Sequence, residues 1–196
     1  MSLCGARLGP TVAGMGSDVS IETGRLLLRH VVVDDAAEMA AVLGDPCLYE
    51  FTGGAPETSS QLATRYARWV AGPSKPGQQW LNLVVRERMT LRAVGYVQAT
   101  INPQASDVAW VIGVPWQRRG YAIEATRAMV EHLVREHRVS VLRALIRLDH
   151  AASQRIAVHL GLARTGEVVD GEEVWLGRAA RQMETQAPST GADGAR

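Results

Sequence analysis

Trp110-Val-Ile-Gly-Val-Pro-Trp-Gln-Arg-Arg-Gly-Tyr-Ala122 joins an apolar, strand-like run to a polar turn and then to the start of a helical pattern. The first amides of a helix lack acceptors within the helix, and the helix dipole favours negative charge at this end. Arg118 and Arg119 add two cations to the same turn. The stretch therefore predicts an anion-binding turn, and we expect it to hold a pyrophosphate. Taken by itself, it is equally compatible with a solvated connection between a strand and a helix.

Periodic apolar residues on both sides of this stretch predict the remaining strands and helices. We expect strands over 25–33, 80–86, 92–101, 107–114 and 141–146, helices over 34–43, 58–70, 119–136 and 151–160, and a terminal hairpin of 162–169 with 174–177. Short turns join the middle three strands, which favours antiparallel pairing, whereas the strand over 141–146 follows a helix and can lie parallel to the strand over 107–114. This order predicts an α+β fold with a mixed, mostly antiparallel sheet and helices on both faces.

Composition indicates one globular domain between two tails. The chain has 196 residues, of which 46% are hydrophobic and 21% charged, close to the norm for a folded domain. Residues 1–18 and 181–196 are rich in small residues and show no period, so we expect flexible tails around a domain over 19–180. Met15 is a possible alternative start of the protein.

Charge and cysteine content exclude several classes of protein. The formal net charge is only +1, which argues against broad nucleic-acid binding. The two cysteines make neither a disulfide framework nor a zinc spacing, so we expect a reducing, cytoplasmic setting and no metal. No apolar run reaches the length of a membrane span, so no membrane partner is expected either. The sequence leaves a monomer and a homodimer open.

Four segments resemble the GNAT superfamily of acyl-CoA-dependent N-acyltransferases, and within it the branch of Rim-type ribosomal-protein N-terminal acetyltransferases. They are Thr23-Gly-Arg-Leu-Leu-Leu-Arg29, the acidic and aromatic strand from Asp107 to Pro115, Gln117-Arg-Arg-Gly-Tyr-Ala122, and the segment from Asp149 to Leu162. The third matches the family's Q/R-x-x-G-x-G/A loop for the coenzyme A pyrophosphate, and the resemblance covers about residues 21 to 180. The sequence departs from the family at Ala157, where many members have tyrosine, and at His150, where asparagine is usual.

The resemblance implies transfer of an acetyl or other short acyl group from coenzyme A to a primary amine, by direct attack in a ternary complex. The acceptor is then a protein N-terminus or a small molecule, the donor is acetyl-CoA or another short acyl-CoA, and no metal takes part. The positions that it implies for cofactor binding are Ile112, Gly113, Val114, Gln117, Arg118, Arg119, Gly120, Tyr121, Ala122, His150 and Ser153. Because two family positions are altered, a coenzyme A-binding module with weak or no turnover is the alternative.

Two residues are candidates for moving protons. A substrate ammonium must lose a proton before it attacks, and Asp107 stands where this branch commonly has an acidic residue on the central strand. Aspartate is a methylene shorter than glutamate, so we expect it to act through a water molecule, and the open alternative is a solvated residue in a turn. Ser153 matches the serine of the branch and is the candidate partner of the coenzyme A sulfur. The alternative is a serine that serves only the end of its helix.

The acceptor pocket is expected between the two early helices and the terminal hairpin. Glu50 and Phe51, in the loop before the second helix, and Trp69, on that helix, are the candidates for contacting the acceptor. Trp110 on the central strand is the fourth candidate. The identity of the amine and the length of the acyl group do not follow from these residues.

Overall fold

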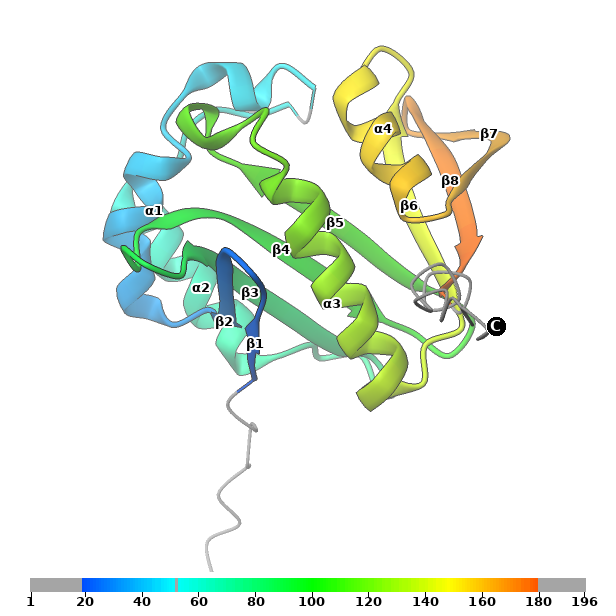
Figure 1. Cartoon of the computed structure of the whole chain (residues 1–196), viewed down its shortest axis with the longest axis horizontal. Helices are drawn as coiled ribbons and strands as arrows, with labels where there is room; N and C mark the ends of the chain where they lie inside the picture. The colour runs from blue at the N-terminus through cyan, green and yellow to red at the C-terminus, as the bar shows by residue number, and fades with distance from the viewer. Residues whose placement is uncertain (1–18, 52, 180–196) are drawn as a thin grey trace, which may run out of the picture.

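The computed structural model describes residues 19–51 and 53–179, which form one eight-stranded sheet and four α-helices (Figure 1). The strands are β1 (Ser20–Glu22), β2 (Leu26–His30), β3 (Gln79–Glu87), β4 (Ala93–Ile101), β5 (Ser106–Ile112), β6 (Val141–Arg147), β7 (Ala163–Val169) and β8 (Glu172–Arg178). The helices are α1 (Ala36–Val42), α2 (Ser59–Ala71), α3 (Tyr121–His137) and α4 (Ala151–His159), with single 3₁₀ turns η1 (Val33–Asp35), η2 (Pro46–Tyr49) and η3 (Val114–Trp116). The two predicted tails lie outside the described residues.

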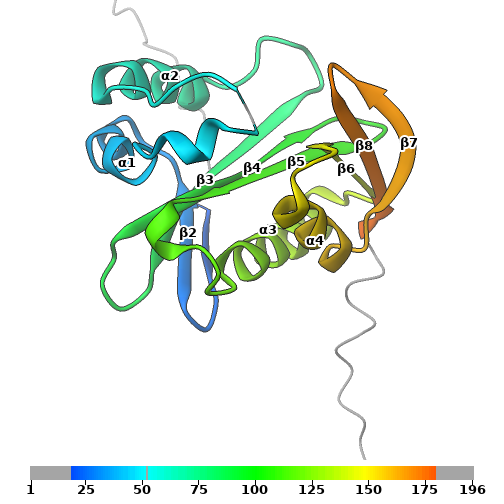
Figure 2. The same cartoon turned by 90° about the horizontal axis from the view of Figure 1, so that it is seen from above.

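The strands lie in the order β1-β2-β3-β4-β5-β6-β8-β7. Every neighbouring pair is antiparallel except β5 and β6, which are parallel over only two residue pairs, Ser106 with Leu142 and Asp107 with Arg143. Helices α1 and α2 cover one face of the sheet, while α3 and α4 cover the other (Figure 2). The predicted α+β class, the mixed sheet and the parallel strand after the long helix are confirmed.

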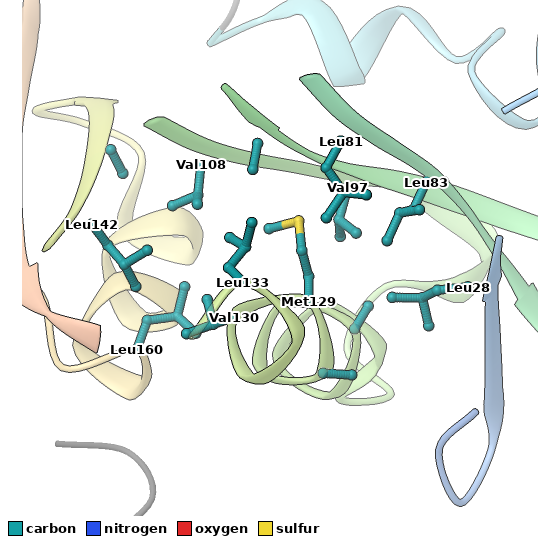
Figure 3. Close-up of a cluster of buried hydrophobic side chains, with 14 of the residues drawn as sticks. Leu28, Leu81, Leu83, Val97, Val108, Met129, Val130, Leu133, Leu142 and Leu160 are labelled. Atoms are coloured by element: carbon teal, nitrogen blue, oxygen red, sulfur yellow. The ribbon is translucent and has the colours of Figure 1, made fainter. Parts of the chain in front are cut away.

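The larger core lies between the sheet and α3. Met129 and Leu133 stand four residues apart on one face of α3 and are fully buried against Val97 of β4 and Leu142 of β6 (Figure 3). Burying a side chain of this size contributes about 1.5–3 kcal/mol. Because α3 starts directly after the turn that follows β5, this packing fixes the turn against the sheet.

Local signals in the sequence explain where α2 and the last hairpin begin. The Thr58 hydroxyl accepts a hydrogen bond from the Gln61 amide at 3.3 Å, and the Gln61 side chain accepts one from the Thr58 amide at 2.8 Å. This capping box confirms the predicted start of α2. The β7–β8 turn places Asp170 and Gly171 at φ 51° and 84°, the left-handed pair of a tight hairpin. Val70, expected on the apolar face of α2, is instead 59% exposed.

A buried ion-pair network joins β2, β3 and α1. Asp35, with a side chain only 2% exposed, pairs with Arg29 at 2.5 Å and with Arg86 at 2.8 Å. It also accepts a hydrogen bond from the Val32 amide at 2.9 Å, and Arg86 reaches Glu38 at 2.8 Å. Asp35 is the residue directly before α1, but its carboxylate makes no capping hydrogen bond to that helix. The reason is that two arginines from neighbouring strands meet it in the interior.

Candidate functional site

The sheet opens between β5 and β6. The Gly113 amide donates to the Val94 carbonyl at 2.8 Å, directly opposite in the β4–β5 register. Because hydrogen-bonding direction alternates along an antiparallel strand, the backbone groups of Trp110 and Ile112 point away from β4, toward the opening. The Ile112 carbonyl accepts a hydrogen bond from the Gln117 side chain at 2.9 Å. Beyond the two parallel pairs, the main-chain groups of Trp110 and the amide of Ile112 therefore face the opening unpaired by described residues, whereas the Ile112 carbonyl is taken by Gln117.

A cavity of about 420 Å³ lies at this opening. Its volume falls in the range of small-molecule pockets. The lining comes from four strands and from the two segments above them: Phe51, Tyr96, Gln98, Thr100, Asp107, Val108, Ala109, Trp110, Val111, Arg143, Ala144, Leu145, Ile146, Arg147, His150, Ser153 and Glu172. The predicted residues Phe51, Asp107, Trp110, His150 and Ser153 thus meet around one space.

Asp107 holds the only carboxylate of β5 in this lining. One of its oxygens accepts from Arg143 Nε on β6, and the other accepts from Asn102 Nδ2 at 3.3 Å. The side chain is still 33% exposed. These two donors fix the orientation of the carboxylate, and its exposed part remains accessible to water from the cavity.

The other end of the cavity is formed by the start of α4. The His150 ring stacks on Phe51 with ring centroids 4.1 Å apart and planes within 2°. Burial lowers the pKa of His150 below its usual range, so the imidazole is neutral near pH 7. Ser153, in the first turn of α4, has no hydrogen-bond partner among the described residues. Its hydroxyl is therefore available to a group in the cavity.

The turn before α3 has the geometry of an anion nest. Arg118 and Gly120 adopt left-handed φ values of 61° and 81°. Within the described part of the chain, the backbone amides of residues 118–123 donate to no acceptor, and the first intrahelical bond runs from the Glu124 amide to the Gly120 carbonyl at 3.1 Å. Consecutive free amides in alternating backbone conformations form a concave anion site. This geometry supports the prediction made from the sequence.

Arg25, ahead of β2, braces this turn. Its guanidinium donates to the Arg119 carbonyl at 2.9 Å and pairs with Glu124 at 2.6 Å. The Thr23 hydroxyl donates to the same carboxylate at 2.6 Å, and Arg25 lies 4.8 Å above the Tyr121 ring. These contacts, led by those of Thr23 and Arg25, lower the pKa of Glu124 against the effect of its partial burial. The first-strand motif of the sequence therefore supports the turn from about 100 residues away.

Two predicted acceptor contacts are not part of the cavity. Glu50 is exposed at the end of η2 and faces solvent. The Trp69 ring packs on Tyr66 at 5.2 Å and edge-on against Tyr96 at 5.8 Å, inside the smaller core beneath α2. Trp69 therefore does not contact the cavity itself. It packs against Tyr96, which does line the cavity.

Gly113 differs from the expectation that its backbone is free for a pantetheine arm. Its amide donates to Val94, and its carbonyl accepts from the Trp116 amide at 2.9 Å. A Cβ at this position would lie 2.8 Å from the Val42 carbonyl oxygen of α1. Gly113 is therefore required for close packing of α1, and the groups that face the opening are those of Trp110 and the amide of Ile112.

Several cavity residues were not identified from the sequence. Tyr96, Gln98 and Thr100 alternate along β4, and Arg143 and Arg147 flank Leu145 along β6. Glu172 enters from β8. The period-two alternation of β6 was the available signal, because a strand with buried Leu142, Ala144 and Ile146 must place its arginines on the opposite face.

No group of three or more possible metal ligands occurs among residues 19–51 and 53–179. Within the same ranges, no helix is long and apolar enough to cross a membrane.

Comparisons with known proteins were made for both sequence and structure. The family model for the acetyltransferase (GNAT) domain matches residues 25–163. No curated protein matches the sequence. A GNAT-family acetyltransferase from Bacillus anthracis superposes with a TM-score of 0.70 at 16% identity, covering 83% of this chain and 99% of the other. RimJ of Mycobacterium smegmatis in complex with CoA-disulfide gives 0.68 at 16%, covering 87% and 95%. Spermidine N-acetyltransferase from Vibrio cholerae in complex with CoA and spermine gives 0.67 at 13%, covering 82% and 99%. At these identities the structures share the fold.

Proposed function

Since the chain belongs to the GNAT family of acetyltransferases, we propose that it transfers an acetyl or short acyl group from an acyl-CoA to a primary amine of a small molecule or a protein N-terminus. The observation that carries this proposal is the opening between β5 and β6. It places unpaired main-chain groups of β5, a cavity and an acidic side chain at one point of the sheet. Transfer by direct attack requires donor and acceptor to be held together in such a space.

The residues present fit acetyl-CoA, which supplies the activated acyl thioester when bound. The free amides of residues 118–123 would hold its pyrophosphate, and Arg118 and Arg119 would add charge. The main-chain groups of Trp110 and the amide of Ile112 would pair with the amide groups of the pantetheine arm. His150 and Ser153 would border the thioester end.

Asp107 is the proposed acceptor of the proton that the substrate ammonium must lose. Its carboxylate oxygens already hold Arg143 and Asn102, so a water molecule would carry the proton to it. The amine nitrogen then forms a bond to the acyl carbon, the carbon–sulfur bond breaks, and the sulfur takes the second proton that the nitrogen loses as it becomes an amide. Ser153 is the proposed hydrogen-bond donor to that sulfur, because Ala157, where tyrosine occurs in many relatives, is fully buried and carries no hydroxyl.

The test is thiol release from acetyl-CoA with a panel of amines that includes peptides, amino acids, aminoglycosides and polyamines. We expect release that depends on both acetyl-CoA and one class of amine. Incubation without an amine measures background hydrolysis. Absence of amine-dependent release across the whole panel would contradict the proposal.

The second candidate function is a coenzyme A-binding module without turnover, and Ala157 is the observation that favours it. Calorimetry then detects coenzyme A binding although no amine is acylated. Thermal unfolding is a further measurement, because a ligand that binds only the folded protein raises its stability. This candidate is excluded if the protein acylates any amine and replacement of Asp107 by asparagine abolishes that activity.

Replacing Gly120 by valine is expected to weaken coenzyme A binding by roughly tenfold or more, equivalent to about 1.4 kcal/mol. Gly120 has a left-handed φ of 81°, and a Cβ there would lie 3.4 Å from the Arg25 guanidinium that braces the turn. The backbone strain alone costs about 1–2 kcal/mol of stability. Isothermal titration calorimetry and urea unfolding measure the two effects separately.

Gly171→Val is the matched control for Gly120→Val. Gly171 has a φ of 84°, and a Cβ there meets nothing within 4 Å. It lies in the β7–β8 turn, so the variant carries similar strain and should bind coenzyme A normally. Equal binding by both variants would mean that the turn before α3 does not hold the pyrophosphate.

A further inference from the structure

Arg143 and Arg147, both on β6, line the cavity. They alternate with Leu145 along the exposed face of β6, whereas Leu142 and Ile146 point into the core. The helices on this face of the sheet, α1 and α2, lie over β3 and β4 and leave β6 and β8 uncovered (Figure 2). Both arginines therefore reach the space in which the acceptor must lie.

Each guanidinium keeps donors that are not used by the protein. Arg143 donates through Nε to Asp107, and its two terminal nitrogens have no acceptor among the described residues. Arg147 donates to both oxygens of Asp149, through Nε and one terminal nitrogen at 3.0 Å each, and its other terminal nitrogen is unpaired in the same part of the chain. Both side chains are 45% exposed. A guanidinium has five N–H donors, so both can bind a further anion.

Neither carboxylate of the lining uses the free terminal nitrogens of these arginines. Both oxygens of Asp107 are occupied, and the remaining carboxylate of the lining, Glu172, lies opposite Arg147 in the β6–β8 register. His150 adds no charge near pH 7, because burial lowers its pKa. Arg147 is already paired with Asp149, which lies outside the lining. The unused donors therefore belong chiefly to Arg143, and they suit an acceptor that carries an anionic group as well as its amine.

We propose that the acceptor is a primary amine that also bears a carboxylate or phosphate group, bound by the guanidinium groups of Arg143 and Arg147. This inference rests on the proposed function and names the substrate class of the same site. Arginine suits the role because its planar fork forms paired hydrogen bonds to carboxylate and phosphate oxygens. Arg143 is the principal contact, since both of its terminal nitrogens are unoccupied by described residues.

The experiment compares amines that differ only in the charge at their far end. The carboxylate series is 4-aminobutanoate, 4-aminobutanamide and 1,4-diaminobutane; the phosphate series is 2-aminoethyl phosphate and ethanolamine; the peptide series is alanyl-aspartate and alanyl-asparagine. We expect kcat/KM for thiol release to be at least tenfold higher for the anionic member of at least one series. The series in which the preference appears identifies the carboxylate or the phosphate as the group recognised.

Arg143→Gln and Arg147→Gln test which side chains cause the preference, and Arg155→Gln, on the exposed side of α4, is the control. Loss of Arg143 also removes a partner of Asp107, which lowers turnover with every acceptor equally. The diagnostic quantity is therefore the ratio of kcat/KM between the anionic and neutral members. We expect Arg143→Gln to reduce this ratio at least tenfold, with the KM for acetyl-CoA unchanged, and Arg155→Gln to leave it unaltered.

The possible failures separate the two proposals. Equal kcat/KM for anionic and neutral amines, or a preference that survives in both Arg143→Gln and Arg147→Gln, overturns the assignment of the arginines and leaves the acyltransferase function intact. A preference for 1,4-diaminobutane also overturns it. If no amine in any series or in the wider panel is acylated, both proposals fail.

Discussion

Asp35→Ala is expected to lower the free energy of unfolding by about 3–5 kcal/mol, the cost of removing one partner from a buried ion pair. The Asp35 carboxylate is 2% exposed and holds Arg29, Arg86 and the Val32 amide. Without it, the Arg29 and Arg86 guanidinium groups lie close together with no carboxylate between them. Arg86 keeps Glu38, which limits the loss without removing it. Urea unfolding followed by circular dichroism measures the change.

Asp34→Ala is the control for this prediction. Asp34 is the adjacent residue in η1 and is exposed, so its removal should change stability by no more than about 0.5 kcal/mol. The free energies of unfolding of Asp35→Ala and Asp34→Ala are compared. If they differ by less than about 1 kcal/mol, well below the cost of a broken buried ion pair, the network does not stabilise the fold.

The same network predicts how stability depends on pH. Burial acts to raise the pKa of Asp35, but hydrogen bonds from Arg29, the Val32 amide and Arg86 outweigh it, so the pKa lies below its ordinary value of 3.8. A carboxyl group with a lowered pKa in the folded state stabilises the protein above its unfolded-state pKa, and this contribution is lost as the pH falls through the folded-state pKa. The stability difference between wild type and Asp35→Ala should therefore be largest near neutral pH and shrink below about pH 4.

Asp107→Asn is expected to reduce kcat/KM about 10²- to 10⁴-fold, the range observed when a general base is lost. The amide oxygen can still accept the hydrogen bond from Arg143 Nε, and only the longer bond from Asn102 Nδ2 is lost, while the basic carboxylate is removed. Coenzyme A binding should be unchanged, because Asp107 lies far along β5 from the turn that begins at Gln117. Steady-state thiol release and calorimetry measure the two properties.

Asp170→Asn is the matched control for Asp107→Asn. Asp170 lies in the β7–β8 turn at a φ of 51°, a conformation that asparagine tolerates, and it does not line the cavity. It should retain full activity. If Asp107→Asn keeps more than half of the wild-type activity, the base lies elsewhere, and Glu172 is then the carboxylate of the lining to replace next.

Structural features that depend only on neighbouring residues in the sequence could be predicted well. The strand, turn and helix around Gln117 to Ala122 were identified because the apolar period changes from two to about four at that point, and α3 buries Met129 and Leu133 as this spacing requires. The start of α2 could be predicted for the same reason, because its cap involves only Thr58 and Gln61, three residues apart. Three-residue β1 was missed, because a segment of that length is too short to show any alternation.

Features that depend on distant partners could not be predicted. Asp35 looks like the start of a helix until the fold brings Arg86, 51 positions later, against it. The stack of Phe51 on His150 joins two segments that lie far apart in the sequence, so no local pattern predicts it. Trp69, an aromatic residue on an early helix, was a candidate for the pocket. The packing of α2 places its ring against Tyr96 instead.

The opening between β5 and β6 also affects how other chains can add to this sheet. A free strand edge at the rim of a sheet can recruit foreign strands and start aggregation. Here the unpaired groups of Trp110 and Ile112 lie inside the sheet, with β6 diverging beside them. The fold thus keeps these groups away from the rim, where foreign strands add, and leaves them open to a ligand in the cavity.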